Sequence, residues 1–521
     1  MTVDLSLYLV TDSTPAILGN GDLCKVVEES LKGGVTVVQY RDKTSDTGVL
    51  VETAKKLHAI TQRYNVPLLI NDRVDVALAS GAEGVHLGQD DMDIGTAKKL
   101  LKEDAIIGIS ASSIEEAVTA VENGADYLGI GTTFATPTKT NTKSIIGTAG
   151  VKKILDALSH LDRSVGTVAI GGINTRNVQR VIYQSAAPTK HLDGVAIVSA
   201  IMAAEDPESA AKELKGLITT RPTFAVDVLA PRKNEEELLL ARIPEVVQRV
   251  ASTHPLVHNM INFVVVNFVA NMALAAGISP IMSPYGDEAK DLAVHNGALL
   301  INMGTLTSTS IPEYLKALTA YNTNGNPVVL DPVGVGATNI RRNAVTTLLA
   351  GGYFTLIKGN EREIKEVFQR SGGESQRGVD SGPTTMDDHA KATLVRDLAR
   401  RERNIVLLTG AVDYLSDGNR VIAVENGHEI LGRATGTGCA IGTISGAYLV
   451  AYPEDKLLAV LAGLVMYEIA AENAVASKDR VRGSGSFVPT FLDEIDIIRG
   501  KAEKGDHSWF EKRAKIRIVD V

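Results

Sequence analysis

Short runs of β-branched and aliphatic residues alternate with amphipathic helical patterns through the first 220 residues. Helical stretches such as 49–64, 95–102, 114–123 and 148–160 separate the runs. Strands that alternate with helices predict right-handed βαβ units and a parallel sheet. Eight such units favour a closed (β/α)8 TIM barrel, with an open doubly wound sheet as the alternative. The eight predicted strands are 7–11, 35–40, 67–70, 83–87, 105–109, 126–130, 166–170 and 194–198.

The second half of the chain predicts another α/β domain. Its strand patterns lie at 298–303, 327–331, 354–358, 405–409 and 421–425, with helical patterns between most of them. Two long apolar segments, 254–277 and 456–476, are expected to be buried helices. Both contain polar or charged residues, which argues against membrane spans. The Gly/Ser-rich segment 371–387 predicts a mobile surface loop.

A connector is expected between the two halves. A helix at 205–219 is expected to pack on the barrel, and two prolines and a charged helix follow it. We therefore predict a linker at about 222–236, with a first domain over 1–225 and a second over 226–521.

Composition narrows the classes of partner. A chain of 521 residues is too long for one ordinary core, and its net charge of −9 argues against a nucleic-acid-binding protein. The two cysteines, Cys24 and Cys439, lie far apart in sequence, and the N-terminus lacks the pattern of a signal peptide. We expect a cytoplasmic protein that acts on small molecules, with no nucleic-acid or membrane partner.

Polar residues in the first half follow the apolar runs rather than precede them. In a barrel, these positions all open onto the C-terminal face, where barrel enzymes place their active sites. Arg41 and Lys43 suit a diphosphate, and the carboxylates of Asp72 and Asp91 suit Mg²⁺. Asp72 has a second interpretation as a helix cap. His86 is interpreted as a packed residue at a strand end.

A phosphate site is predicted after the seventh and eighth strands. Gly172, Val198 and Ser199 stand there, where backbone N–H groups commonly bind phosphate in barrels. The segment after the sixth strand adds Thr136, Thr138 and Lys139 in a flexible loop.

The second half contains a glycine-rich turn that leads directly into an apolar helix, RATGTGCAIGTISGAYLVAY at 433–452. Backbone N–H groups at such a helix start form an anion hole for a phosphoryl group. Cys439 lies in the first turn, where we expect a lowered thiol pKa and proton transfer from an attacking hydroxyl. The alternative is a small buried residue that closes a tight turn.

Further candidates in the second half lie at strand ends. Asp331 precedes glycines in VVLDPVGVGAT, and Asn360 and Glu363 form an N-x-x-E pattern; these oxygens suit Mg²⁺ and its waters. Thr409 ends the strand IVLLTG and is available to a nucleotide.

The first half resembles the thiamine-phosphate synthase family. The matching stretches include VQYRDK (38–43), LLINDRVDVA (68–77), GVHLGQDD (84–91), GADYLGIGTTFATPTK (124–139) and GVAIVSAI (194–201). The resemblance implies Mg²⁺ on Asp72 and Asp91, and a dissociative reaction in which diphosphate leaves before the thiazole nitrogen attacks. It implies a thiazole-phosphate site at Thr136, Pro137, Thr138, Gly172, Val198 and Ser199. It implies a pyrimidine-diphosphate site at Gln39, Tyr40, Arg41, Asp42, Lys43, Asn71, Ser110 and Lys139.

The second half resembles the hydroxyethylthiazole kinases of the ribokinase-like superfamily. The matching stretches include LINMGTL (300–306), DPVGVGAT (331–338), KGNEREI (358–364) and TGTGC (435–439). The resemblance implies Cys439 as the proton acceptor, thiazole contacts from Met282 and Gly436, ATP contacts from Lys358 and Thr409, and Mg²⁺ near Asp331 and Glu363.

The two halves together resemble the bifunctional fungal thiamine enzymes. The kinase product is the second substrate of the synthase, so the two resemblances support each other. They imply ATP as co-substrate, Mg²⁺ in both domains and a homo-oligomer in multiples of three. The alternatives are one active domain with the other retained for assembly, a change of substrates on the same folds, or a non-catalytic sensor of thiamine phosphate.

Overall fold

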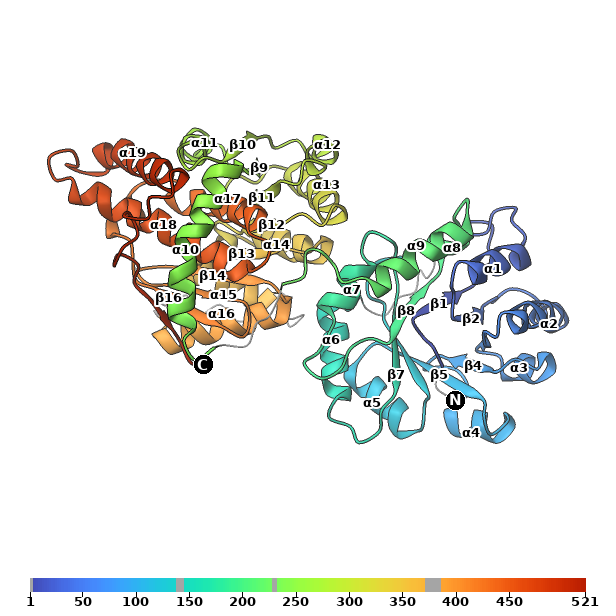
Figure 1. Cartoon of the computed structure of the whole chain (residues 1–521). Coiled ribbons are helices and arrows are strands. Elements are labelled where there is room, and N and C mark those ends of the chain that lie inside the picture. The colour runs from blue at the N-terminus through green and yellow to red at the C-terminus, as the bar shows by residue number, and fades with distance from the viewer. Residues whose placement is uncertain (1–2, 137–144, 227–231, 371–385) are drawn as a thin grey trace. The chain divides into compact units, whose positions relative to one another are not determined.

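The computed structural model describes residues 3–136, 145–226, 232–370 and 386–521, and the chain forms two compact units, Met1–Pro222 and Thr223–Val521 (Figure 1). The predicted surface loop at 371–387 lies outside the described residues except for its last two positions.

The first unit is a closed barrel of eight parallel strands in sequence order, so all eight predicted strands are confirmed. Closure is direct, because β1 pairs with both β2 and β8. The strands are β1 (Leu7–Val10), β2 (Val37–Tyr40), β3 (Leu68–Asn71), β4 (Gly84–Leu87), β5 (Ile106–Ala111), β6 (Tyr127–Ile130), β7 (Gly166–Ile170) and β8 (Gly194–Ile197).

Helices follow the barrel strands and cover their outer face (Figure 1). Successive strand residues alternate between the barrel interior and the helical layer. The last helix, α9, packs against α1 as expected for residues 205–219. The helices are α1 (Leu23–Lys32), α2 (Thr47–Arg63), α3 (Val74–Ser80), α4 (Ile94–Leu100), α5 (Ile114–Glu122), α6 (Gly147–Leu158), α7 (Val178–Gln184), α8 (Ser199–Met202) and α9 (Pro207–Thr219).

The second unit is built on a nine-stranded sheet in the order β10-β9-β11-β12-β13-β14-β15-β16-β17. The sheet is parallel from β10 to β14 and antiparallel from there to β17. The strands are β9 (Leu256–Met260), β10 (Ser279–Met282), β11 (Ala298–Asn302), β12 (Val328–Asp331), β13 (Leu356–Asn360), β14 (Ile405–Thr409), β15 (Asp413–Ser416), β16 (Val421–Val424) and β17 (Ile516–Ile518).

Two apolar cores lie on opposite faces of this sheet. Leu300 and Leu407 belong to the core with α10, α11, α17, α18 and α19, whereas their neighbours Ile301 and Leu408 belong to the core with α12 to α16. The helices are α10 (Glu235–Thr253), α11 (Val266–Ala275), α12 (Ala289–Ala293), α13 (Ser310–Thr323), α14 (Asn339–Gly351), α15 (Glu361–Arg370), α16 (Asp388–Glu402), α17 (Thr437–Ala451), α18 (Lys456–Ala476) and α19 (Ser484–Glu503), with short 3-10 turns at Gly286–Glu288, Val335–Ala337 and Glu429–Arg433.

The prediction of one buried helix over 254–277 is wrong. The segment forms β9 and then α11. A strand buried on both faces is a continuous apolar run, which periodicity does not separate from a buried helix. The Asn259 side chain in β9 is hydrogen-bonded inside the core: its amide donates to Val257 O at 2.9 Å and accepts from the Thr443 hydroxyl at 2.6 Å.

The second long apolar segment is a helix, as predicted. By length and composition α18 could cross a membrane, but 83% of its apolar window is buried inside the unit. The charged helix expected in the connector is α10, and it contributes Leu239, Ile243 and Val247 to the core of the second unit.

Candidate active sites

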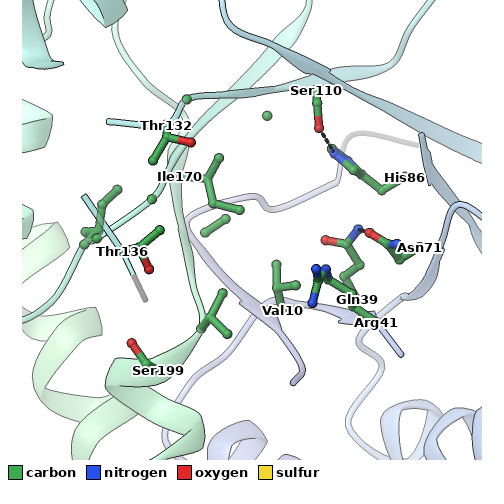
Figure 2. Close-up of a pocket in the computed structure, with 17 residues that line it drawn as sticks. Val10, Gln39, Arg41, Asn71, His86, Ser110, Thr132, Thr136, Ile170 and Ser199 are labelled. Carbon is green, nitrogen blue, oxygen red and sulfur yellow. Dashed lines mark hydrogen bonds between the residues drawn. The ribbon is translucent and has the colours of Figure 1, made fainter. Parts of the chain in front are cut away.

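A pocket opens at the carboxyl ends of the barrel strands (Figure 2). Strand-end residues from all parts of the barrel meet there, although they lie up to 190 positions apart in the chain. The pocket brings together eight of the predicted site residues, which are Gln39, Arg41, Asn71, Ser110, Thr136, Gly172, Val198 and Ser199.

Local bonds fix the polar wall of this pocket. The Gln39 amide donates to Asn71 Oδ1 at 3.0 Å. Arg41 is anchored at both ends, because its backbone N–H donates to Thr11 Oγ1 at 3.0 Å and its guanidinium lies 3.6 Å from the Asp12 carboxylate. The guanidinium is therefore positioned in advance for a negatively charged ligand such as a phosphate group.

Glycines shape the opposite wall. Gly171 and Gly172 both have positive φ, at 105° and 65°. A Cβ at Gly172 would lie 2.7 Å from Ala135 O, so only glycine allows this close approach of β7 to the segment after β6. Val198 and Ser199 line the same pocket at the start of α8, and backbone N–H groups at a helix start suit phosphate oxygens.

Asp72, Asp91 and Lys43 form a charged cluster near these strand ends. Lys43 Nζ lies 3.1 Å from Asp72 Oδ2, and Asp91 Oδ2 accepts from the backbone N–H of Gly88 at 2.7 Å. Burial and the neighbouring Asp72 carboxyl raise the pKa of Asp91. Two carboxyl groups in contact repel when both are charged, and a divalent cation would relieve that repulsion, so the donor set fits Mg²⁺. Among the described residues, no group of three or more acidic, histidine or cysteine side chains is placed to hold a metal ion.

Besides the residues of this charged cluster, the predicted residues Tyr40 and Asp42 are not among those that line the pocket. Tyr40 follows Gln39 in β2 and points outward, where it is 3% exposed among the residues between barrel and helices. Asp42 accepts hydrogen bonds from Thr44 and Ser45 and stabilises its own loop. Strand alternation explains the first correction, because neighbours of an inward residue face outward. Pro137, Thr138 and Lys139 lie outside the described residues.

His86 is a pocket residue that the sequence interpretation undervalued. It lines the pocket, and its Nε2 lies 2.9 Å from Ser110 Oγ (Figure 2). The inward orientation of His86 could have been predicted from the sequence. His86 and Leu87 are neighbours at the end of β4, and neighbours in a strand face opposite sides, so with Leu87 outward His86 faces inward. Val10, Gly129, Thr132 and Ala196 also line the pocket, and nothing in their side-chain chemistry distinguished them in sequence.

The second unit places a polar cluster beneath the start of α17. Lys358 Nζ lies 3.0 Å from Asp331 Oδ1 and donates to Gly438 O at 3.0 Å. Asn302 donates to Asp331 Oδ2 at 2.7 Å, and Asn262 donates to Asn302 Oδ1 at 2.9 Å. Hydrogen bonds and the Lys358–Asp331 ion pair thereby connect the ends of β11, β12 and β13 to the glycine-rich turn.

Cys439 belongs to this cluster. Its Sγ lies 3.6 Å from Asn262 Nδ2. The expected lowered pKa is wrong: burial and the Asp331 carboxylate raise the pKa of the thiol, and Lys358 only partly offsets them. The helix start alone favours a thiolate, but desolvation and a buried carboxylate act against it more strongly.

The remaining kinase candidates occupy the same edge of the sheet. Glu363 accepts from the backbone N–H of Gly334 at 2.8 Å and of Asn360 at 2.9 Å, and its charge contributes to a raised Asp331 pKa of about 6, which burial chiefly causes. A buried carboxyl with a raised pKa fits a cation site. Thr409 ends β14 opposite Asn360.

The thiazole candidates of the second unit stand at a strand end and at a helix start. Met282 ends β10, and Gly436 begins α17 with φ 99°. A Cβ at Gly436 would lie 2.8 Å from the Phe268 ring, so this position requires glycine both for conformation and for space.

The first unit is thus a phosphate-binding barrel of the enzyme type, and the second is an α/β unit with a phosphoryl-transfer site. Family models agree with this division: Thiamine monophosphate synthase matches residues 7–201, and the Hydroxyethylthiazole kinase family matches 247–500. A probable thiamine biosynthetic bifunctional enzyme of Schizosaccharomyces pombe is 44% identical, with 99% of each chain covered. A thiamine biosynthetic bifunctional enzyme of Saccharomyces cerevisiae is 38% identical, with 95% of each covered. A solved hydroxyethylthiazole kinase of Pyrococcus horikoshii is 36% identical over 54% of this chain and all of its own, with a TM-score of 0.47.

The chain therefore belongs to the family of bifunctional thiamine biosynthetic enzymes, with a thiamine-phosphate synthase barrel and a ribokinase-like hydroxyethylthiazole kinase unit.

Proposed function

We propose that the two units carry out consecutive reactions. The kinase unit transfers the γ-phosphoryl group of ATP to 4-methyl-5-(2-hydroxyethyl)thiazole. The barrel then joins the thiazole phosphate to 4-amino-2-methyl-5-pyrimidinylmethyl diphosphate and releases thiamine phosphate and diphosphate. The observation that carries the proposal is the barrel pocket, where a cationic and amide wall, Arg41 with Gln39 and Asn71, faces a glycine wall suited to a second phosphate.

In the barrel, the residues that bind the pyrimidine diphosphate are Gln39, Arg41, Lys43, Asn71, Ser110 and Lys139. Thr136, Thr138, Gly172, Val198 and Ser199 bind the thiazole phosphate. Mg²⁺ on Asp72 and Asp91 would stabilise the charge of the leaving diphosphate. The contact between these two carboxyl groups supports this assignment.

In the kinase unit, the backbone of the turn at Gly436 and Gly438 binds the transferring phosphoryl group, and Thr409 contacts ATP. Met282 and Gly436 contact the thiazole. Lys358 stabilises the turn from below through Gly438 O and contributes positive charge. Mg²⁺ near Asp331 and Glu363 would neutralise phosphate charge, and Cys439 accepts the proton of the attacking hydroxyl.

We further propose a cytoplasmic homo-oligomer in multiples of three. The large apolar side chains of Phe263 and Val264, 64% and 78% exposed, support association through the kinase unit. Light scattering that gave a mass outside multiples of three would contradict this assembly. The free state of Cys24 and Cys439 agrees with a reducing compartment.

The test supplies hydroxyethylthiazole, the pyrimidine diphosphate, ATP and Mg²⁺ to the whole chain and measures thiamine phosphate. Asp72→Asn should accumulate thiazole phosphate. Cys439→Ala should recover when thiazole phosphate is supplied directly. A wild-type chain that makes no thiamine phosphate from thiazole phosphate would refute the barrel assignment.

A further inference from the structure

A continuous chain of four hydrogen-bonding groups runs through the inside of the barrel to the pocket. The hydroxyls of Tyr8 and Tyr127 are 2.7 Å apart, the Tyr127 hydroxyl is 2.8 Å from His86 Nδ1, and His86 Nε2 is 2.9 Å from Ser110 Oγ. Figure 2 shows the last link, with Ser110 and His86 facing each other at the pocket wall. Four strands, β1, β6, β4 and β5, contribute one group each.

The barrel interior is packed around these rings. Tyr8 and Tyr127 are each 1% exposed. A Cβ at Gly108 would lie 2.0 Å from Tyr127 Cζ, and a Cβ at Gly129 would lie 3.0 Å from His86 Cε1. Glycine at these two positions therefore provides the space that holds the tyrosine and histidine in line.

The buried end of this series of hydrogen bonds, at Tyr8, determines which group donates and which accepts at each link. Burial raises the pKa of both tyrosines, so each stays neutral with one hydrogen. Among the described residues, Tyr127 is the one hydrogen-bond partner found for the Tyr8 hydroxyl. If hydrogens pointed from Ser110 toward Tyr8, the Tyr8 O–H would have no acceptor in a dry core, which is costly. In the opposite direction the hydrogens of Tyr8, Tyr127 and His86 each have an acceptor, and only the Ser110 hydrogen is left to point into the pocket.

We propose that this relay of Tyr8, Tyr127 and His86 fixes Ser110 as a hydrogen-bond donor to the pocket. Tyr8 donates to Tyr127, Tyr127 donates to His86 Nδ1, and neutral His86 donates from Nε2 to Ser110 Oγ. Ser110 then presents its own hydrogen to the ligand. The relay selects an acceptor there, and, on the proposed function, that acceptor is a ring nitrogen of the aminopyrimidine rather than its amino group. Tyr8, Tyr127 and His86 are positioning residues, since they act through Ser110.

The first test reads the tautomer directly. The full chain is labelled with ¹⁵N in its ten histidine rings and studied by magic-angle-spinning NMR at mildly alkaline pH, with His86→Asn identifying the His86 signals. The expected result is a protonated Nε2 and an unprotonated, hydrogen-bonded Nδ1. In Tyr127→Phe, the Nδ1 signal should move to the position of a nitrogen without a hydrogen bond. A proton on Nδ1 in the wild type would overturn the proposed direction.

The second test reads the ligand. Titration of the full chain measures the Kd of the pyrimidine diphosphate and of two analogues in which one ring nitrogen is replaced by C–H. We expect one analogue to bind about tenfold more weakly, as for loss of one hydrogen bond. Ser110→Ala should remove this discrimination, and Tyr127→Phe should reduce it several-fold. Equal Kd values for all three ligands in the wild type would overturn the inference.

Tyr8→Phe is the matched control. It removes a hydroxyl from the same interior, but it leaves Tyr127 with His86 as acceptor, so the tautomer and the discrimination should persist. An equal loss in both variants would mean that packing, not direction, is responsible. The KM for thiazole phosphate reports an intact barrel in every variant. A wild type that synthesises thiamine phosphate yet fails these tests refutes the relay alone, whereas a wild type without synthesis refutes the proposed function.

Discussion

At the scale of single residues, the Cys439 thiol is kept protonated by its surroundings. Burial and the Asp331 carboxylate raise its pKa, while Lys358 acts in the opposite direction. A thiol is a proton acceptor only in its deprotonated form. The fraction of Cys439 that is competent as a base is therefore small near neutral pH and grows as pH rises toward the thiol pKa.

This protonation state predicts a pH dependence for the kinase reaction. Thiazole phosphorylation by the wild type should increase with pH above about 7, because the thiolate fraction increases until the thiol has titrated. Cys439→Ala should lower kcat by about 10²-fold and remove the rise. Initial rates across pH, with ATP and Mg²⁺ saturating, check both effects. An unchanged pH slope in Cys439→Ala would exclude the thiol as the base.

Asp91 supports a prediction about the synthase metal. Its contact with Asp72 raises its pKa, so the pair holds more negative charge than the site stabilises on its own. Asp91→Asn should raise the Mg²⁺ concentration for half-maximal synthesis at least about tenfold. Asp93→Asn is the control, because Asp93 only caps α4 through Thr96. It should change the Mg²⁺ requirement less than about twofold, since cap exchange alters helix stability and not metal binding. Equal requirements in both variants would place the metal elsewhere.

At the scale of elements, one buried arginine joins three segments of the kinase unit. Arg420, 1% exposed, lies 2.8 Å from Asp417 after β15, 3.0 Å from Glu235 at the start of α10 and 3.0 Å from Asp455, the cap of α18. Burial raises the pKa of Asp455, but the hydrogen bonds and charge of Arg420 outweigh it and hold that pKa below its usual value. This contribution to stability is present above the unfolded carboxyl pKa and is lost as pH falls through the folded one.

Removal of this cation should destabilise the kinase unit strongly. Arg420→Met leaves three buried carboxylates without the cation that pairs them, so we expect a loss of about 3–5 kcal/mol in the free energy of unfolding. Arg433→Met is the matched control, because the Arg433–Glu429 pair is exposed, and it should cost less than about 1 kcal/mol. Calorimetry, with loss of kinase activity marking the relevant transition, measures both. Similar transitions for the two variants would contradict a stabilising role for the network.

The elements also explain how far the sequence could be interpreted. All eight barrel strands were predictable, because each is a short apolar run ending in polar residues that share one face. The segment 254–277 was not, since β9 is buried on both faces. The bonds of His258 Nε2 with Ser283 O and of Asn259 Oδ1 with the Thr443 hydroxyl form only in the folded unit. The short strands β15 and β17 were missed, because antiparallel additions of three or four residues leave little periodicity.

The candidate sites likewise contain residues that could be predicted from the sequence and residues that could not. Gln39, Arg41 and Asn71 were predictable, because strand ends of a barrel converge. Tyr40, which the resemblance implied, packs between the barrel and the helices, as strand alternation requires of the neighbour of the inward-facing Gln39. The relay behind Ser110 could not be predicted, because the contacts of Tyr8 with Tyr127 and of Tyr127 with His86 join strands that are distant in sequence.

At the scale of the whole molecule, each unit has its own apolar cores and its own site. The pocket of the barrel is lined only by residues between Val10 and Ser199, and the cluster around Asp331 and Cys439 contains only residues of the second unit. Among the described residues, neither the pocket nor the cluster contains a side chain from the other unit of the chain. On the proposed function, thiazole phosphate is the product of the second unit and the substrate of the first.

Independent sites predict complementation between two inactive chains. Asp72→Asn retains the kinase site and Cys439→Ala retains the synthase site, so neither alone should make thiamine phosphate efficiently from hydroxyethylthiazole. A mixture of the two should restore synthesis, because thiazole phosphate released by one chain diffuses to the other. The rate should approach that of wild type as concentrations rise above the KM for thiazole phosphate. If the mixture stays inactive while added thiazole phosphate still rescues Cys439→Ala, the intermediate is not released, and transfer within one chain would be required.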